Sequence, residues 1–105
     1  MKRFDLYSSS SATLNEVGSA IEQHLGIELS ERESGYRGGI YFRFTSDEER
    51  IMVQTNLPDD EGYRQESDLS EQAILVYVSR SNRWGALEEL LTAQCALELV
   101  STDLV

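Results

Sequence analysis

The sequence predicts a single α+β domain spanning residues 1–105, a mostly antiparallel sheet with two helices packed on one face. Three observations predict this fold. Several short segments alternate apolar with polar residues, as strands do, and two segments carry apolar residues at helical spacing. The elements follow the order β-α-β-β-β-β-α-β, with no internal repeat and no interdomain linker. A chain of 105 residues with 40% hydrophobic residues has the size and composition of one globular domain.

The N-terminal quarter predicts a strand and then a helix. RFDLY, residues 3–7, alternates apolar and polar side chains as a short strand does. Thr13 and Glu16 have the spacing of a capping box, so we expect a helix to begin there. Gly26 is well placed to end that helix. The apolar stripe of the helix consists of Leu14, Val17, Ile21 and Leu25.

The middle of the chain predicts three strands. IELSERE, residues 27–33, alternates and then turns polar, as an exposed or edge strand would. SGYRGG, residues 34–39, reads as a turn. IYFRFT (residues 40–45) and RIMVQTNL (residues 50–57) both alternate, and SDEE (residues 46–49) connects them, so these two strands should form an antiparallel hairpin.

The C-terminal part predicts a strand, a helix and a last strand. AILVYVS, residues 73–79, is apolar nearly throughout. It is either a central strand covered on both faces or one whose outer face holds Leu75 and Tyr77 against a helix. WGALEELLTA, residues 84–93, has helical spacing, and Ser81 or Asn82 could cap it. QCALELVS, residues 94–101, returns to alternation as a strand that opens near a buried Cys95.

The charge balance limits the partners that this chain could bind. Nine basic against nineteen acidic residues give a net charge of −10. Nucleic acid and anionic membranes are therefore expected not to be partners, because both attract an excess of Lys and Arg, whereas basic proteins are favoured. With one cysteine, no disulfide within the chain and no zinc cluster is expected. The N-terminus lacks the apolar run of a signal peptide, so a cytoplasmic location is expected.

No motif predicts an enzyme or a cofactor site. His24 lies beside the apolar stripe of the first helix, with neither an orienting partner nor a nucleophile indicated. Cys95 is expected to be a small buried side chain rather than a nucleophile. GYRGG (residues 35–39) lacks the spacing of a phosphate-binding loop, and DDEG (residues 59–62) lacks that of a calcium loop. We therefore expect no catalytic residues, no metal and no cofactor.

The acidic segment from residue 47 to residue 71 is the candidate partner-binding region. It holds nine acids and two arginines, a net charge of −7. A charge run is often only a solvated loop, but a connection of this length in a compact domain is commonly disordered or functional. Tyr63 adds an aromatic side chain of the kind that interfaces favour. The candidate residues are Asp47, Glu48, Glu49, Asp59, Asp60, Glu61, Tyr63, Glu66, Asp68 and Glu71.

Much of the chain resembles a family of small acidic bacterial proteins. The resemblance lies in LGIELSERESGYRGGIYFRF, RIMVQTNL and ILVYVSRSNRWGALEELL, between Leu25 and Leu91. These strings are similar to immunity proteins of contact-dependent growth inhibition and related polymorphic toxin systems. The resemblance implies a cytoplasmic antitoxin that binds a cognate toxin domain, often a nuclease, and blocks its active site. The family shares no catalytic motif, so no functional residue is carried over from it.

Two further functions remain open from the residues alone. One is a small structural or adaptor subunit, whose acids only maintain solubility and whose exposed strand edge binds other subunits. The other, a small enzyme or ligand-binding domain, would need a nucleophile, a base and an orienting group together, and the sequence indicates no such set.

Overall fold

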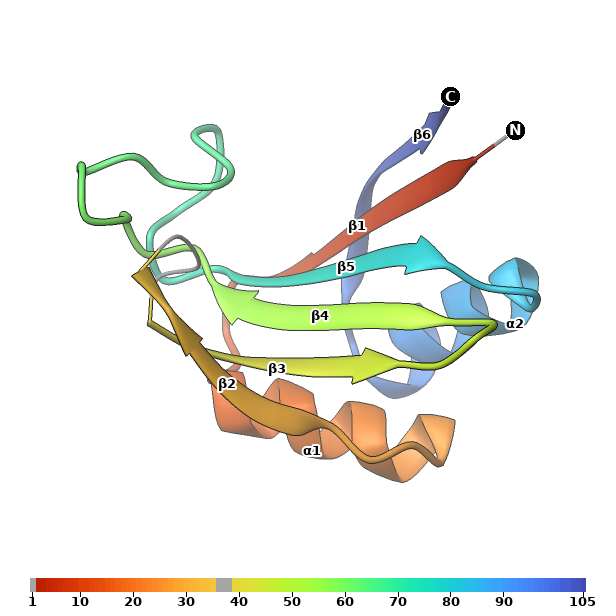
Figure 1. Cartoon of the computed structure of the whole chain (residues 1–105). Helices are drawn as coiled ribbons and strands as arrows, with labels where there is room; N and C mark the ends of the chain where they lie inside the picture. Colours follow the sequence, from red (N-terminus) through yellow and green to blue (C-terminus); the bar gives the residue numbers. More distant parts are fainter. Residues whose placement is uncertain (1, 36–38) are drawn as a thin grey trace.

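The computed structural model describes residues 2–35 and 39–105, and it confirms the predicted α+β architecture (Figure 1). The described strands form one antiparallel sheet in the order β2-β3-β4-β5-β1-β6. The elements are β1 (Arg3–Ser9), α1 (Leu14–Leu25), β2 (Ser30–Ser34), β3 (Gly39–Thr45), β4 (Arg50–Thr55), β5 (Ile74–Arg80), α2 (Trp84–Glu89), the π-helical segment η2 (Leu90–Gln94) and β6 (Glu98–Leu104).

Helix α1 begins and ends where the sequence predicts. The Thr13 hydroxyl accepts a hydrogen bond from the Glu16 N–H at 3.2 Å, and the Glu16 carboxylate accepts one from the Thr13 N–H at 2.9 Å. This reciprocal pair is the predicted capping box. At the other end, Gly26 takes a left-handed conformation, with φ of 68°, and donates its N–H to the Glu22 carbonyl. Glycine adopts this conformation without a Cβ clash, so the helix stops there.

Both helices pack on one face of the sheet, around the main hydrophobic core. From α1 the core receives Val17 and Ile21, and from α2 and η2 it receives Leu87 and Leu91. The sheet contributes every second residue of its central strands. These strand residues are Tyr7, Ile51, Val53, Ile74, Val76 and Val78, and all are buried. The predicted placement of the two helices on one face is therefore confirmed.

The C-terminal strand starts later than predicted. The helix that begins with α2 continues as η2 through Gln94, and the Cys95 N–H donates to the Leu90 carbonyl at 3.0 Å. Ala96 then takes a positive φ of 57° and turns the chain into β6. Cys95 is buried, but it ends the helical segment and does not open a strand. The alternation of Leu97 and Leu99 suggested an earlier start, because the period of a strand can continue into the turn before it.

The structure also differs from the prediction in two smaller details. Arg83 is the N-cap residue of α2 and no side chain caps the helix, so neither Ser81 nor Asn82 does so; the Ser81 hydroxyl instead accepts from the Arg83 N–H. Strand β2 is an edge strand as expected, but it begins at Ser30 rather than residue 27. The turn predicted at residues 34–39 lies in part outside the described residues, which omit 36–38.

Candidate functional site

The connection between β4 and β5, residues 56–72 and called the acidic loop below, is held together by the side chain of Asn56. Asn56 is fully buried. Its Nδ2 donates to the carbonyl oxygens of Glu66, Leu69 and Ser70 at 2.8, 3.1 and 3.0 Å, and its Oδ1 accepts from the Glu66 N–H at 3.0 Å. Because Nδ2 carries two hydrogens, one of them is shared between two of these carbonyls; the one carboxamide thus contacts four backbone groups in the second half of the loop and fixes that half against the end of β4.

The acidic loop also covers part of the sheet face opposite the helices. Leu69 packs against a small apolar cluster of Leu6, Ala73 and Leu75. Beside this cluster, the Tyr77 hydroxyl donates a hydrogen bond to the Glu66 carboxylate. Strand β5 is therefore covered on both faces at this end, by the helices on one and by the loop on the other. The alternative prediction, a helix over Leu75 and Tyr77, is wrong because both helices lie on the other face.

The tip of the acidic loop is a tight turn organised by Asp59. The Asp59 carboxylate accepts from the N–H groups of Glu61 and Tyr63 at 2.9 and 3.0 Å. Gly62, with φ of 88°, permits the chain reversal. Asp60 lies against Gly35, where an added Cβ would meet the Asp60 carboxylate at 2.6 Å. The carboxylate of Asp59 shapes the turn, whereas Glu61 and Tyr63 face solvent, with Tyr63 70% exposed.

The second half of the loop is partly neutralised from within. Arg64 donates from Nη2 to the Ser67 carbonyl at 2.7 Å, and its Nη1 lies 3.9 Å from the Glu71 carboxylate. This contact to Glu71 is long and half exposed, so it adds little free energy. Asp68 is exposed in the same segment.

The acids of the β3–β4 turn have different roles from one another. Glu49 is only 5% exposed, and Arg83 donates to both its carboxylate oxygens, from Nε at 2.9 Å and from Nη2 at 2.8 Å. The Ser81 hydroxyl donates a third hydrogen bond. Burial alone would raise the pKa of Glu49, but the hydrogen bonds from Arg83 and Ser81 outweigh it and hold that pKa below its ordinary value. Glu49 therefore ties the turn to the start of α2.

The predicted site residues do not form one surface. Figure 1 shows the acidic loop at one end of β4 and the β3–β4 turn at the other, and a strand of six residues is about 20 Å long. Of the ten residues, Glu49 is buried and Asp59 and Glu66 are half-buried. The exposed ones are Asp60, Glu61, Tyr63, Asp68 and Glu71 in the loop and Asp47 and Glu48 in the turn.

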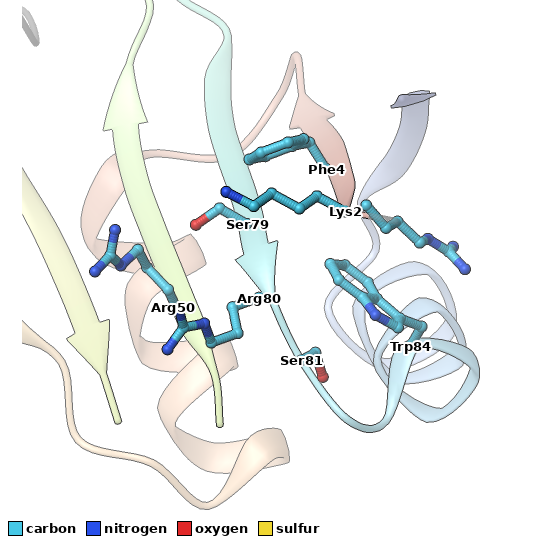
Figure 2. A pocket seen from close by; sticks show the side chains of 8 residues that line it. Lys2, Phe4, Arg50, Ser79, Arg80, Ser81 and Trp84 are labelled. Carbon is cyan, nitrogen blue, oxygen red and sulfur yellow. The ribbon is translucent and has the colours of Figure 1, made fainter. Parts of the chain in front are cut away.

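The structure also reveals a basic groove that the sequence did not indicate (Figure 2). It has a volume of about 330 Å³ and lies between the start of β1 and the adjoining ends of β4 and β5. Its cationic lining residues are Lys2, Arg3, Arg50 and Arg80, and Phe4 and Trp84 add aromatic surface. These residues are scattered along the sequence, so the only signal was the dominance of arginine among the bases.

The buried Asp5 carboxylate and Tyr7 hydroxyl on β1 also stabilise the fold. Arg3 donates from Nε and Nη2 to the Asp5 carboxylate at 2.9 and 3.1 Å, and the Tyr7 hydroxyl donates to the same group at 3.1 Å. Burial first, and then the charge of Asp5, raise the pKa of Tyr7 far above its ordinary value. Burial likewise raises the pKa of the Cys95 thiol, which keeps it protonated.

Within residues 2–35 and 39–105, no group of three or more His, Cys, Asp or Glu side chains is arranged to hold a metal ion. No helix in the same ranges combines the length and apolarity needed to cross a bilayer. Comparison with protein-family models gives no match, and comparison with curated proteins gives no significantly similar sequence.

Proposed function

We propose that this chain is a non-enzymatic binding protein that neutralises a basic partner protein, as the immunity proteins that its motifs resemble do with their cognate toxins. The observation that carries the proposal is the construction of the acidic loop. A loop that served only solubility would not need a buried Asn56 with four hydrogen bonds to its backbone. This anchoring reduces the entropy that the loop would lose on binding a partner.

The charge of the acidic loop supports a basic partner. The loop carries six acids and one arginine. Four of these acids, Asp60, Glu61, Asp68 and Glu71, are exposed together with Tyr63. A nuclease cleft that binds phosphates is basic, so carboxylates could occupy it in their place, and the opposite charges would accelerate encounter. Such an inhibitor would meet its toxin in the cytoplasm.

The proposed surface is the loop alone. Asp47 and Glu48 lie at the far end of β4 (Figure 1), and Glu49 is committed to Arg83. The Asp59 carboxylate accepts a backbone hydrogen bond within the tip, and the Glu66 carboxylate accepts one from Tyr77. Both groups therefore stabilise the loop rather than face the partner. The residues expected to contact the partner are therefore Asp60, Glu61, Tyr63, Asp68 and Glu71.

The test is binding and inhibition of the toxin encoded beside this gene. The double variant Asp60→Lys/Glu61→Lys leaves the Asp59 turn intact and should slow association at low salt by roughly tenfold or more. A matched control is Glu89→Lys/Glu98→Lys, which makes the same charge change at two exposed positions outside the loop. If both double variants slowed association equally, the effect would come from net charge alone, and the acidic loop would not be the binding surface. If the unaltered chain did not bind the toxin, the proposed function itself would fall.

The exposed edge of β6 favours a second candidate, a structural or adaptor subunit. Val100 and Leu104 on this strand are 42% and 60% exposed. An exposed, partly apolar edge strand can pair with another chain. In that case light scattering would detect a stable oligomer that Val100→Lys dissociates and that Asp60→Lys/Glu61→Lys leaves unchanged. A monomer at all concentrations would exclude self-assembly.

A further inference from the structure

The basic groove is unusual in a chain with a net charge of −10. Four of its eight lining residues are cationic and none is acidic. Arg3 is paired with Asp5 and forms one wall of the groove. Its guanidinium carbon lies over the Trp84 ring, 4.9 Å from the ring centroid. For Lys2, Arg50 and Arg80 the described residues offer no carboxylate within ion-pair distance. Among the described residues, Arg80 donates a side-chain hydrogen bond to the backbone carbonyl of Asp47, at 3.2 Å.

The register of the sheet makes this arrangement costly for the folded chain. Arg50 and Arg80 are paired at the end of the β4–β5 ladder, just beyond a register shift between Arg50 and Ile51. Like charges at paired positions of neighbouring strands destabilise a sheet. Nineteen acids are present in the chain, yet none in the described part forms an ion pair with either arginine. A local cost of this kind is typical of positions that serve function rather than stability.

The groove continues along the sheet face that the helices leave uncovered. A second concavity of about 260 Å³ shares Phe4, Arg50 and Ser79 with it and adds Met52 and Tyr77, together with the buried Asp5 and Val78 and with Gln65 of the acidic loop. A third, of about 310 Å³, extends from Arg50 and Met52 to Tyr41 and Arg43 on β3. Arginine, methionine and aromatic residues are the types enriched at protein interfaces. The face is therefore elongated, shallow and cationic, which suits an extended segment better than a compact ligand.

We infer that this face, which includes the basic groove, binds an acidic segment of a partner protein in extended form. Arginine pairs with carboxylates through two parallel hydrogen bonds, and Arg50 and Arg80 occupy paired positions of neighbouring strands, so one extended segment can reach both. In Figure 2 the Lys2 side chain extends from β1 toward Ser79 on β5, so its ammonium adds a third cation on the side of β1. Phe4, 39% exposed, offers apolar contact between the charges.

A protein segment suits the whole molecule better than a nucleic acid. Nucleic acid carries a phosphate at every nucleotide, and such a polyanion would be repelled by the net charge of the chain. A segment with a few carboxylates spaced by apolar side chains avoids most of this repulsion. This inference goes beyond the proposed function, because it concerns a second surface of opposite charge that needs no basic toxin.

The experiment uses the full chain and a short fluorescein-labelled peptide of alternating Glu and Tyr, with binding followed by fluorescence anisotropy. The probe should bind and should weaken as salt rises. The double variant Arg50→Gln/Arg80→Gln should reduce its affinity roughly a hundredfold, since at least one charge-assisted hydrogen bond is lost at each position and each is worth about a factor of ten. Thermal unfolding of this variant should show unchanged or raised stability, because the like-charge pair is gone.

Three controls make the result decisive. Arg64→Gln removes one arginine from the acidic loop, outside the residues that line the three concavities, and should leave peptide affinity unchanged. A peptide of alternating Lys and Tyr should not bind at this face. Oligothymidylate of matched length should bind more weakly than the acidic peptide, and tighter binding would overturn the inference in favour of single-stranded nucleic acid. Equal affinities for the unaltered chain and the double variant would also overturn it.

Discussion

At the scale of single residues, two acids of the same type that are adjacent in the sequence can have different structural roles. Glu48 and Glu49 are adjacent in the β3–β4 turn, yet Glu48 is exposed beside Asn82 and Glu49 is buried against Arg83. The sequence could not separate them, because Arg83 is 34 residues away along the chain. The charge of a segment is evident from the amino-acid sequence, but the partner of each charge depends on which distant strand or helix folds against it.

The lowered pKa of Glu49 makes its contribution to stability dependent on pH. Because the folded value lies below the ordinary 4.5, the contribution is complete above that pH and is lost as pH falls through the folded value. We expect Glu49→Gln to lower the free energy of unfolding by about 2 kcal/mol near neutral pH. The difference from the unaltered chain should shrink in acid, as urea unfolding at a series of pH values would measure.

Glu48→Gln is the matched control for this measurement. It changes the neighbouring exposed acid and should alter the free energy of unfolding by no more than about 0.5 kcal/mol at any pH. A Glu49→Gln difference that stayed constant between neutral pH and acid would mean that the carboxylate charge does not hold the turn to α2.

At the scale of elements, local signals predicted most of the fold. The capping box and Gly26 fixed the bounds of α1, and alternation located the β3–β4 hairpin. The elements that differ depend on contacts or conformations without a local signature. The η2 segment and the left-handed Ala96 delay β6, and no glycine marks that turn. The sequence indicated the acidic loop only by its length and charge. The ordered conformation of the loop depends on Asn56, and in the sequence this asparagine looks like an ordinary turn residue.

The order of the acidic loop should depend on Asn56. In Asn56→Ala, the Leu69 carbonyl and the Glu66 N–H lose the hydrogen bond that Asn56 gives them, whereas the carbonyls of Glu66 and Ser70 keep the N–H groups of Leu69 and Ala73. We expect the free energy of unfolding to fall by about 2 to 3 kcal/mol. Amide hydrogen exchange in the second half of the loop should accelerate more than exchange in α1. Asn15→Ala, at an exposed position of α1, is the control and should change neither quantity appreciably.

Equal exchange rates in Asn56→Ala and the unaltered chain would show that the loop is held by something other than this carboxamide. The rigid surface proposed for partner binding would then lose its structural basis. Faster exchange with weaker partner binding would instead link the order of the loop to its function.

At the scale of the whole molecule, charge is distributed along the axis of β4. The acidic loop lies at one end, and Arg50 and Arg80 of the basic groove lie at the other, the same end as the exposed Asp47 and Glu48 of the β3–β4 turn (Figure 1, Figure 2). The sequence predicted the acidic end but not the basic one, because the groove assembles residues from the N-terminus, from β4 and β5, and from the start of α2. The net charge of −10 thus conceals two regions of opposite sign.

This separation predicts how the two surfaces influence each other. The two ends of β4 are about 20 Å apart, farther than the Debye length of about 8 Å at physiological salt. Asp60→Lys/Glu61→Lys should therefore leave acidic-peptide affinity unchanged at about 0.15 M salt. At about 0.01 M salt, where the Debye length is about 30 Å, the same variant should accelerate peptide association, because it removes repulsion at long range. Stopped-flow anisotropy at the two salt concentrations measures both. A loss of peptide affinity in this variant at about 0.15 M salt would mean that the acidic loop and the basic groove form one continuous binding site rather than two.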